Sequence, residues 1–592
     1  MGKQKKSKKS KQHQKQGNLK DQLGSILVDN NLPINSQPEL VLDNIKNPLQ
    51  SLNHKLFEKD EENQELVKPV IEASIKAERD CLELYQYLTE KTKTIADETL
   101  EVSFPWRLRV GGMRGFRDLL LPAMHSIYGI PYIPASSIKG SIKAWAKKNR
   151  NIELAEIDRI LGYLKGDKAS MGTVQILDAF PTKPCLSVDI ASPQWKWEGE
   201  KVKYGTVPHH LLSMEKPNLV IGLAYTSRST KNSDDLLKVK EWLQQALSEG
   251  IGSRVSTGYG RLNSNTSLRH RREYKFQMWT QGMHGYNPPS KENKYEGDAE
   301  FRPTAVRGML RYWFRAIALG LYSPKECKTL EGKLFGTLEP ETVEGSLRIN
   351  VNLDDSKEDE QLFPCFYRGK IVLEAEEEKH LKLIEKVLNL SSHLGGIGRG
   401  ARRPLHLNDK RFRGCYWLLT DFQLTNKKED WENFLKEVYK AFTDVKPRTK
   451  PGEGNPGIPE NRYQDVLNKN TQIYIVPDPG MKHPSDVKEW SEGYKPLVLG
   501  KALKLLYSSN EYKGGERNVR KGVFEGNPLV GGKLNTPSYV VIKSNFPKAG
   551  NSYQVVTIFG ANQRERKAFA EELLKDNHKL PPEKKVFTVT HS

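Results

Sequence analysis

The spacing of apolar residues divides the chain into a helical leading part and a longer part in which strands and helices alternate. Residues 21–99 carry apolar positions at helical spacing, so this segment predicts helices, with Pro69 a break or kink. After residue 100, short strand-like runs are separated from amphipathic helices by glycine-rich loops. Their order is strand, loop, helix and strand, then strand, helix, loop and strand. This order is typical of a ferredoxin-like or RNA-recognition-motif-like sheet.

The same pattern starts again at residue 273. The first run contains the helix start IPYIPASSIKGSIKAWAKKN at residues 130–149, and the second contains FRPTAVRGMLRYWFRA at residues 301–316. Both stretches place a small residue, Ile or Val, a cation, Gly, an aliphatic residue, a cation, Trp and a further cation in one order. A helix start repeated this closely indicates a repeated module. We therefore predict an α+β fold, with tandem ferredoxin-like domains behind an N-terminal helical extension.

These patterns predict a chain of six segments. They are a disordered basic tail at 1–20, a helical extension at 21–99, a ferredoxin-like domain at 100–265, a linker at 266–272, a second such domain at 273–420, and a third, degenerate one with insertions at 421–592. The third is suggested by GVFEGNPLVGGKLNTPSYVVIK, which resembles the loop and return strand of the earlier two. The lysine-rich tail either keeps the chain soluble or captures nucleic acid electrostatically.

Charge and composition narrow the class of partner. The formal net charge is +20, which points to a polyanion, first RNA or DNA and second an anionic membrane. No apolar run approaches the roughly 18–20 residues that span a bilayer, and the first twenty residues lack the apolar centre of a secretory signal. The five cysteines form no CxxC pair, which argues against a zinc ribbon and fits a reducing compartment. We expect a soluble cytoplasmic protein that has no membrane partner.

The first helix start is a candidate phosphate cradle. Pro134 presets the turn, and the hydroxyl of Ser136 or Ser137 can cap the first free amides. Lys139 and Lys143 then lie one turn apart on one face, where they and the helix-start amides could hold a phosphate. A capped surface helix with solvated lysines is the alternative. The same cation spacing in the second copy favours the cradle.

Two glycine-rich loops, at residues 250–262 and 395–404, are candidate RNA contacts. Glycine lets backbone amides approach phosphate oxygens, while Arg and Tyr side chains clamp a phosphate or stack on a base. The candidate side chains are Arg254, Tyr259, Arg261, Arg399, Arg402 and Arg403. The first loop follows its helix, so it is not a dinucleotide fingerprint, and no Walker A motif is present. A glycine-rich hairpin without a ligand is the alternative for the first loop.

Candidate catalytic residues are few. His125 and His284 are isolated, and the adjacent pair His209 and His210 has no evident carboxylate partner, so we interpret these histidines as structural. Asp118 lies in the glycine-rich GGMRGFRDLL, where a carboxylate could position a 2′-hydroxyl or a metal near bound RNA. A solvated loop aspartate is the alternative.

Taken together, these motifs resemble the repeat-associated mysterious protein (RAMP) superfamily, the ferredoxin-like RNA-binding subunits of CRISPR effector complexes. The carriers of the resemblance are PYIPASSIKG, the loop at residues 250–260, RPTAVRGMLRYWFRA, LFGTLEPETVEGSLRI and GGIGRGARRP. The first half is similar to subunit six of the type III-B (Cmr) complex, including GTVQILDAFP and the later Asp189. The second half is similar to subunit one, whose RxxSxRGxLRxWxRA motif is matched from Arg302. The chain therefore resembles a natural fusion of six with one.

The resemblance implies a structural RNA-binding subunit for antiviral defence. Such a subunit caps the 3′ end of the guide RNA, helps capture target RNA, assembles with other Cmr subunits and needs no cofactor. The residues implied to contact RNA are Lys139, Lys143, Arg254 and Arg261 in the first half, and Arg302, Arg307, Arg311, Arg315, Arg399, Arg402 and Arg403 in the second.

Two other functions stay open. Nuclease-active backbone subunits of this superfamily carry an aspartate shortly before PYIPGSSLKG, and Asp118 has nearly that position. A target-RNA endoribonuclease that uses Mg²⁺ or another divalent ion is therefore one alternative, although subunits six and one are usually not the nucleases. A stand-alone basic RNA chaperone is the other.

Overall fold

The structure is a computed structural model of the 592-residue chain. It describes residues 45–51, 64–111, 121–149, 151–191, 195–204, 209–229, 234–262, 268–289, 297–337, 341, 343–358, 363–408, 411–447, 465–490, 498–508, 511–512, 517–518, 523–524, 527–532, 537–548, 550–575 and 585–588. Contacts divide the chain into two units. Unit 1 comprises Met1–Asp189, His210–Ser253 and Tyr259–Leu262, and unit 2 comprises Ile190–His209, Arg254–Gly258 and Asn263–Ser592. Two short segments from the first half of the sequence therefore belong to unit 2. The predicted domain limits remain predictions.

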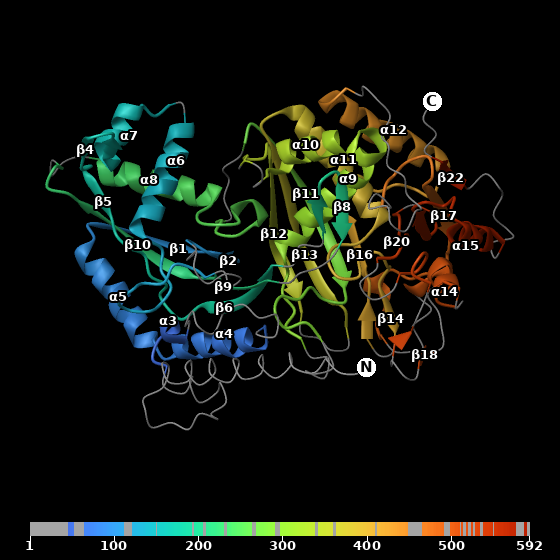
Figure 1. The fold of residues 1–592 in the computed structure, drawn as a ribbon, viewed down its shortest axis with the longest axis horizontal. Helices are drawn as coiled ribbons and strands as arrows, with labels where there is room; N and C mark the ends of the chain where they lie inside the picture. The colour runs from blue at the N-terminus through green and yellow to red at the C-terminus, as the bar shows by residue number, and fades with distance from the viewer. Residues whose placement is uncertain are drawn as a thin grey trace, which may run out of the picture. The chain divides into compact units, whose positions relative to one another are not determined.

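Unit 2 contains a four-stranded antiparallel sheet with the ferredoxin-like order (Figure 1). Its strands are β11 (His270–Thr280), β12 (Leu347–Lys357), β13 (Cys365–Ala375) and β16 (Cys415–Leu419), arranged β12-β13-β11-β16. Helix α9 (Pro303–Leu321) connects β11 to β12, with α10 (Pro324–Phe335) after it, and α11 (Glu378–Leu394) connects β13 to β16. The first and third strands are central and both helices are crossovers, which confirms the predicted fold class.

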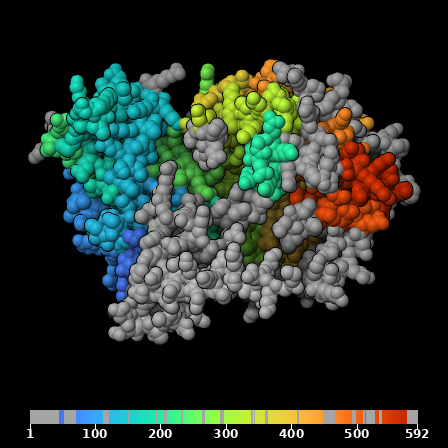
Figure 2. All heavy atoms as spheres, viewed as in Figure 1, coloured from blue at the N-terminus to red at the C-terminus, as the bar shows by residue number. Residues whose placement is uncertain are grey.

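A second sheet in unit 2 repeats this topology. Strands β17 (Gln472–Pro477), β20 (Val540–Asn545), β21 (Tyr553–Ile558) and β22 (Lys585–Thr588) lie in the order β20-β21-β17-β22. Helix α14 (Lys501–Ser508) lies between β17 and β20 in the chain, and α15 (Arg564–Lys575) lies between β21 and β22. The C-terminal part of the chain is therefore a further βαββαβ arrangement. Its outer helices form the orange and red surface of Figure 2.

Both faces of this second sheet are buried, because successive side chains of a strand point to opposite faces. On β17, Ile473 and Ile475 join the core formed by α9, α11 and α12 (Lys428–Val445). Tyr474 and Val476 join a separate core with α14 and α15. The helices of the first sheet are therefore packed between two sheets. A strand buried on both faces reads as a continuous apolar run, which explains why this module looked degenerate in the sequence.

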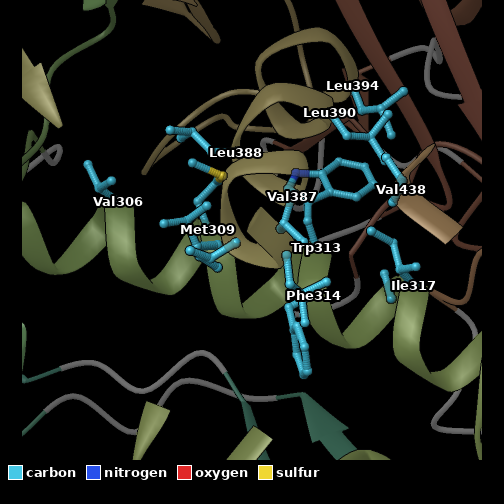
Figure 3. Packing of buried hydrophobic residues seen from close by; sticks show 14 of the residues in the cluster. Val306, Met309, Trp313, Phe314, Ile317, Val387, Leu388, Leu390, Leu394 and Val438 are labelled. Carbon is cyan, nitrogen blue, oxygen red and sulfur yellow. The ribbon is translucent and has the colours of Figure 1, made fainter. Parts of the chain in front are cut away.

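Helix α9 shows how the repeated motif folds. Pro303 occupies the first turn, where its missing amide hydrogen is not needed. Trp313, only 2% exposed, lies among side chains of α11 and α12 such as Leu390 and Val438 (Figure 3). The Trp of the motif is therefore a core residue, and the motif's cations occupy other faces of the helix.

In unit 1, three helices pack on a three-stranded sheet. Strands β1 (Glu98–Ser103), β10 (Asn218–Tyr225) and β5 (Val174–Ile176) pair in the order β1-β10-β5. Helices α6 (Ala135–Lys148), α7 (Leu154–Leu161) and α8 (Asp235–Glu249) pack on this sheet. Residues 250–262 form a loop, as the sequence predicted, and this loop contains the short 3-10 helix η3 (Val255–Thr257). The positive φ angles at Gly250, Gly252, Gly258 and Gly260 are incompatible with a regular strand and agree with the predicted glycine-rich loop.

The described part of the leading segment is helical, as predicted. Helix α4 (Gln64–Arg79) runs through Pro69, so it does not end there, and α5 (Leu82–Ile95) follows. The carboxylate of Glu78 accepts the Tyr85 hydroxyl at 2.6 Å and the amide of Leu186 at 2.7 Å, which attaches these helices to a strand of unit 1. The remaining elements are α3 (Pro48–Ser51), β2 (Arg107–Leu108), β3 (Tyr163–Lys165), β4 (Lys168–Ser170), β6 (Leu186–Ala191), β7 (Trp195–Glu198), β8 (Lys201–Tyr204), β9 (His209–Glu215), β14 (His406–Asn408), β15 (Arg411–Arg413), η4 (Pro484–Asp486), β18 (Arg517–Asn518) and β19 (Val523–Phe524).

Candidate RNA-binding site

At the start of α6, the first backbone amide donates its hydrogen bond to a carboxylate. The amide of Ala135 donates to Oδ1 of Asp178 at 2.7 Å, and the residue before the helix, Pro134, makes no side-chain cap. A negative charge satisfies a helix N-terminus well, because the free amides and the helix dipole both favour it. The expected serine cap is therefore replaced by Asp178 from the GTVQILDAFP stretch. One amide of the predicted phosphate cradle is already used inside the protein.

The two lysines of this helix lie close enough to affect each other. Lys143 donates a hydrogen bond to the carbonyl oxygen of Gly162. Partial burial lowers the pKa of Lys143, and the positive charge of Lys139 lowers it further. The two side chains therefore share one helix face, as the spacing indicated, with Lys143 bound to the backbone.

Tyr259 holds the first glycine-rich loop inside unit 1. Its side chain is fully buried, its hydroxyl donates to the carboxylate of Asp189, and its ring lies 4.6 Å from the ring centre of Trp106. Asp189 also lies 3.9 Å from Nε of Arg107. With its ring enclosed in this network, Tyr259 presents no face on which a base could stack.

The glycines of this loop allow close backbone packing. A Cβ atom on Gly252 would lie 2.3 Å from the carbonyl oxygen of Arg109, and one on Gly260 would lie 2.1 Å from that of Ile251. Both glycines also have a positive φ. Arg254 takes the left-handed conformation with φ of 61° and precedes η3. Arg254 and Arg261 are half-buried, and their contact with RNA stays a prediction.

In unit 2, the β7–β8 hairpin covers two arginines of α9. The guanidinium carbon of Arg315 lies 3.5 Å from the ring centre of Trp195, and that of Arg311 lies 5.0 Å from it. Glu331 accepts Nε of Arg311 at 3.1 Å and Nε1 of Trp197 at 2.8 Å. The hairpin is the teal patch on the yellow-green surface in Figure 2. Arg311 and Arg315 therefore take part in the intramolecular contact between α9 and the hairpin.

The other two arginines of the α9 motif also have protein partners. Arg302 is 8% exposed, donates to the carbonyl oxygen of Ile190 at 3.1 Å and forms an ion pair with Glu300 at 3.3 Å. Arg307 donates to the carbonyl oxygen of Phe335. All four cations of the motif therefore stabilise unit 2, and a contact with RNA stays a prediction for each of them.

Arg402 and Arg403 attach the second glycine-rich loop to the second sheet. Arg402 forms an ion pair with Asp465 at 2.6 Å, and Arg403 donates to the carbonyl oxygen of Val540 at 2.7 Å. The carbonyl oxygen of Arg402 accepts the amide of Ile542, on edge strand β20, at 3.1 Å. Burial alone lowers the pKa of Arg402, but the Asp465 carboxylate outweighs burial and raises it. Both guanidinium groups are therefore used as internal anchors.

Arg399 differs from these anchors because its side chain is exposed. The backbone next to it abuts the end of the β14–β15 hairpin, since a Cβ on Gly400 would lie 2.8 Å from Cα of Gly414. Arg411 and Arg413 lie on that hairpin. Neither arginine was predicted from the sequence as an RNA contact, although the basic run KRFRG at residues 410–414 could have indicated one.

Asp118 lies outside the described residues, and so does the side chain of His209. Among the residues that are described, no group of three or more His, Cys, Asp and Glu side chains could hold a metal ion.

His125 stacks on Tyr128 with ring centres 4.6 Å apart, and Nδ1 of His284 lies 3.2 Å from the carbonyl oxygen of Asp298. In the same part of the chain, no helix has both the length and the apolar character of a membrane span.

Comparison with known proteins gives a consistent set of relatives. The model of the RAMP superfamily matches residues 102–263 and 280–403. The CRISPR system Cmr subunit Cmr1-1 of Pyrococcus furiosus is 24% identical over 272 residues, which cover 40% of this chain and 78% of that protein.

Three solved structures are also similar. The crystal structure of apo Cmr1 from Pyrococcus furiosus has 16% identity and a TM-score of 0.29, and the similarity covers 49% of this chain and 88% of that one. Cmr6 from Pyrococcus furiosus has 20% identity and a TM-score of 0.18, covering 28% and 97%. A type III-B Cmr-beta complex bound to cognate target RNA has a chain with 18% identity and a TM-score of 0.28, covering 41% and 85%.

Proposed function

Residues 102–263 and 280–403 are segments of the RAMP superfamily, and from this we propose that the chain is an RNA-binding structural subunit of a type III-B CRISPR effector complex. The single observation that carries the proposal is the presence of both segments, in tandem, on one chain. The relative from Pyrococcus furiosus is named as a Cmr subunit, and the net charge of +20 suits an RNA partner.

The finer proposal is that the chain caps the 3′ end of the guide RNA and helps capture target RNA. Its support is the resemblance of the first half to Cmr subunit six and of the second half to subunit one. A single chain would then do the work of two neighbouring subunits. Its partners would be guide RNA, target RNA and the other Cmr subunits, in the cytoplasm.

Isolation of the complex tests this function. The full chain carrying an affinity tag is co-expressed with Cmr partner subunits and a CRISPR array, and the RNA that co-purifies is sequenced. We expect repeat-derived guides to be enriched together with the partner subunits. Recovery of bulk cellular RNA without enriched guides and without subunits would instead support a stand-alone RNA chaperone.

The RNA contacts themselves are part of the proposal. Of the residues put forward from the sequence, Tyr259 is enclosed, and the α9 arginines, Arg402 and Arg403 are engaged in the folded chain. Lys139, Arg254, Arg261 and Arg399 are partly or fully accessible. RNA binding by this chain is therefore expected to depend more on its loops than on the outer faces of α9.

A further inference from the structure

Two loops of unit 2 that are separate in the sequence meet at Arg399. Gly400 and Gly414 both have a positive φ, of 77° and 83°, and a Cβ on Gly400 would clash with the backbone of Gly414. The amide of Cys415 donates to the carbonyl oxygen of Arg403 at 3.1 Å, which fixes the glycine-rich loop beside the end of β15. The two glycines therefore permit a contact that any side chain would prevent.

The hairpin places two more arginines on one face. In β15, Arg411 and Arg413 are two positions apart, so their side chains point to the same side of the strand, whereas Phe412 points to the other. The ring of Phe412 packs at 5.3 Å from that of Trp490, which fixes which side faces the interior. Arg411 and Arg413 are both half-buried and lie next to the loop that carries Arg399.

Among the described residues, the side chains of Arg413 and Arg411 act electrostatically on Arg399. Although the Arg399 side chain is exposed, nearby protein atoms displace part of its hydration water and lower its pKa, and the positive charges of Arg413 and Arg411 lower it further. Three guanidinium groups gathered in this way form a positively charged patch that would attract a phosphodiester group. Guanidinium groups suit this ligand, because their donors match phosphate oxygens two at a time.

The site is held by a rigid support. Arg402 and Arg403, which come directly after the loop, are anchored by Asp465 and by carbonyl oxygens of the second sheet. The amide of Gln281, the residue directly after β11, donates to the carbonyl oxygen of Gly414 at 3.2 Å. This hydrogen bond attaches the end of the hairpin to β11. A ligand would therefore meet a loop whose conformation is already fixed, and it would lose little affinity to ordering.

We infer that Arg399, Arg411 and Arg413 form one phosphodiester-binding site for single-stranded RNA. The inference rests on the RNA-binding function proposed above and adds Arg411 and Arg413 to it. The site recognises the backbone, so its contribution to affinity is independent of base sequence.

The test uses the full chain and a fluorescein-labelled single-stranded RNA of mixed sequence, with binding measured by anisotropy over a series of salt concentrations. The variant replaces the three arginines with alanine (Arg399→Ala, Arg411→Ala and Arg413→Ala). The matched control removes three exposed lysines from the same unit, Lys427→Ala, Lys436→Ala and Lys440→Ala, so both proteins lose the same charge. Arg399→Glu alone is a second variant, because it changes only an exposed side chain.

We expect the triple arginine variant to bind on the order of tenfold or more weakly than the lysine control. Its plot of log affinity against log salt should be less steep by up to about 2, since each phosphate contact in a single strand contributes about 0.7. Arg399→Glu should weaken binding in the same direction while the melting temperature stays at the wild-type value.

Failure of the site and failure of the function give different results. If the wild-type chain binds RNA and both arginine variants behave like the lysine control, the site is overturned and the function stands. If the wild-type chain and its assembled complex do not bind RNA at all, the proposed function is overturned and the site with it.

Discussion

The guanidinium carbon of Arg315 lies over the indole ring of Trp195, 3.5 Å from the ring centre, and Arg315 is 1% exposed. Arg315 belongs to the repeated motif of α9, and Trp195 belongs to a hairpin 120 residues earlier in the chain. Arginine stacks well on aromatic rings because it is planar and weakly hydrated. A cation that the motif assigns to RNA thus holds a structural element of unit 2 in place.

Trp195→Ala should destabilise unit 2. The change removes a large ring from the hairpin and leaves Arg315 buried beside a void, so we expect a loss of about 2–4 kcal/mol in the free energy of unfolding. Lys196→Ala is the control, since Lys196 is exposed on the neighbouring position of the same strand. Urea denaturation of both variants measures the difference. Equal stability of the two variants would show that the stack contributes nothing.

Arg402→Ala should be far more damaging than Arg399→Ala, although the two residues lie in one loop. Without Arg402, the buried carboxylate of Asp465 loses its ion-pair partner, and breaking a buried pair in this way typically costs about 3–5 kcal/mol. The exposed Arg399 should change stability by less than about 0.5 kcal/mol. Thermal unfolding compares them. Similar melting temperatures would contradict the anchoring role of Arg402.

Lys543 should make the stability of unit 2 depend on alkaline pH. It is fully buried on β20, donates to the carbonyl oxygen of Trp417 at 2.6 Å, and burial lowers its pKa to about 7. An unfolded lysine titrates near 10.4, so between about pH 7 and pH 10 the unfolded state binds more protons than the folded state. The free energy of unfolding should therefore rise with pH, by at most about 1.4 kcal/mol per pH unit.

The measurement for Lys543 is denaturant unfolding at pH 7 and pH 9. Lys543→Met keeps most of the side-chain volume and removes the charge, so its stability should rise less between the two pH values than that of the wild type. Lys440→Met, on an exposed position of α12, should retain the wild-type rise. An equal rise in Lys543→Met and wild type would assign the pH dependence to another group.

Asp118→Ala should leave target RNA intact or cut as before. We propose a structural subunit, so the assembled complex with guide and labelled target should produce the same cleavage ladder with wild-type and variant chains. The comparison is made with Mg²⁺ present, because the alternative is a metal-dependent nuclease. Loss of one cleavage position in the variant would overturn the structural proposal and assign catalysis to Asp118.

Local pattern was sufficient for much of the architecture. The apolar spacing of residues 301–316 predicted a helix, and α9 occupies it. The recurrence of strand, helix and glycine-rich loop predicted ferredoxin-like sheets, and the order β12-β13-β11-β16 confirms them. These features depend on neighbouring residues, because helix and strand periodicity and turn chemistry act over a few positions. The glycines of residues 250–262 likewise predicted a loop, and their positive φ angles agree with it.

The sequence by itself therefore determined the fold class, the repeated modules and the basic character of the chain. Only the tertiary structure decided what each arginine does. Arg402 forms an ion pair with Asp465, Arg315 lies over Trp195, and Arg399 lies near enough to Arg411 and Arg413 for their charges to lower its pKa. Each of these relationships joins loops or elements that are separate in the sequence, so the spacing of residues within one motif could not predict it. An arginine beside a buried carboxylate or over an aromatic ring becomes an anchor, whereas an exposed arginine such as Arg399 is the kind of side chain that we propose for contact with a polyanion.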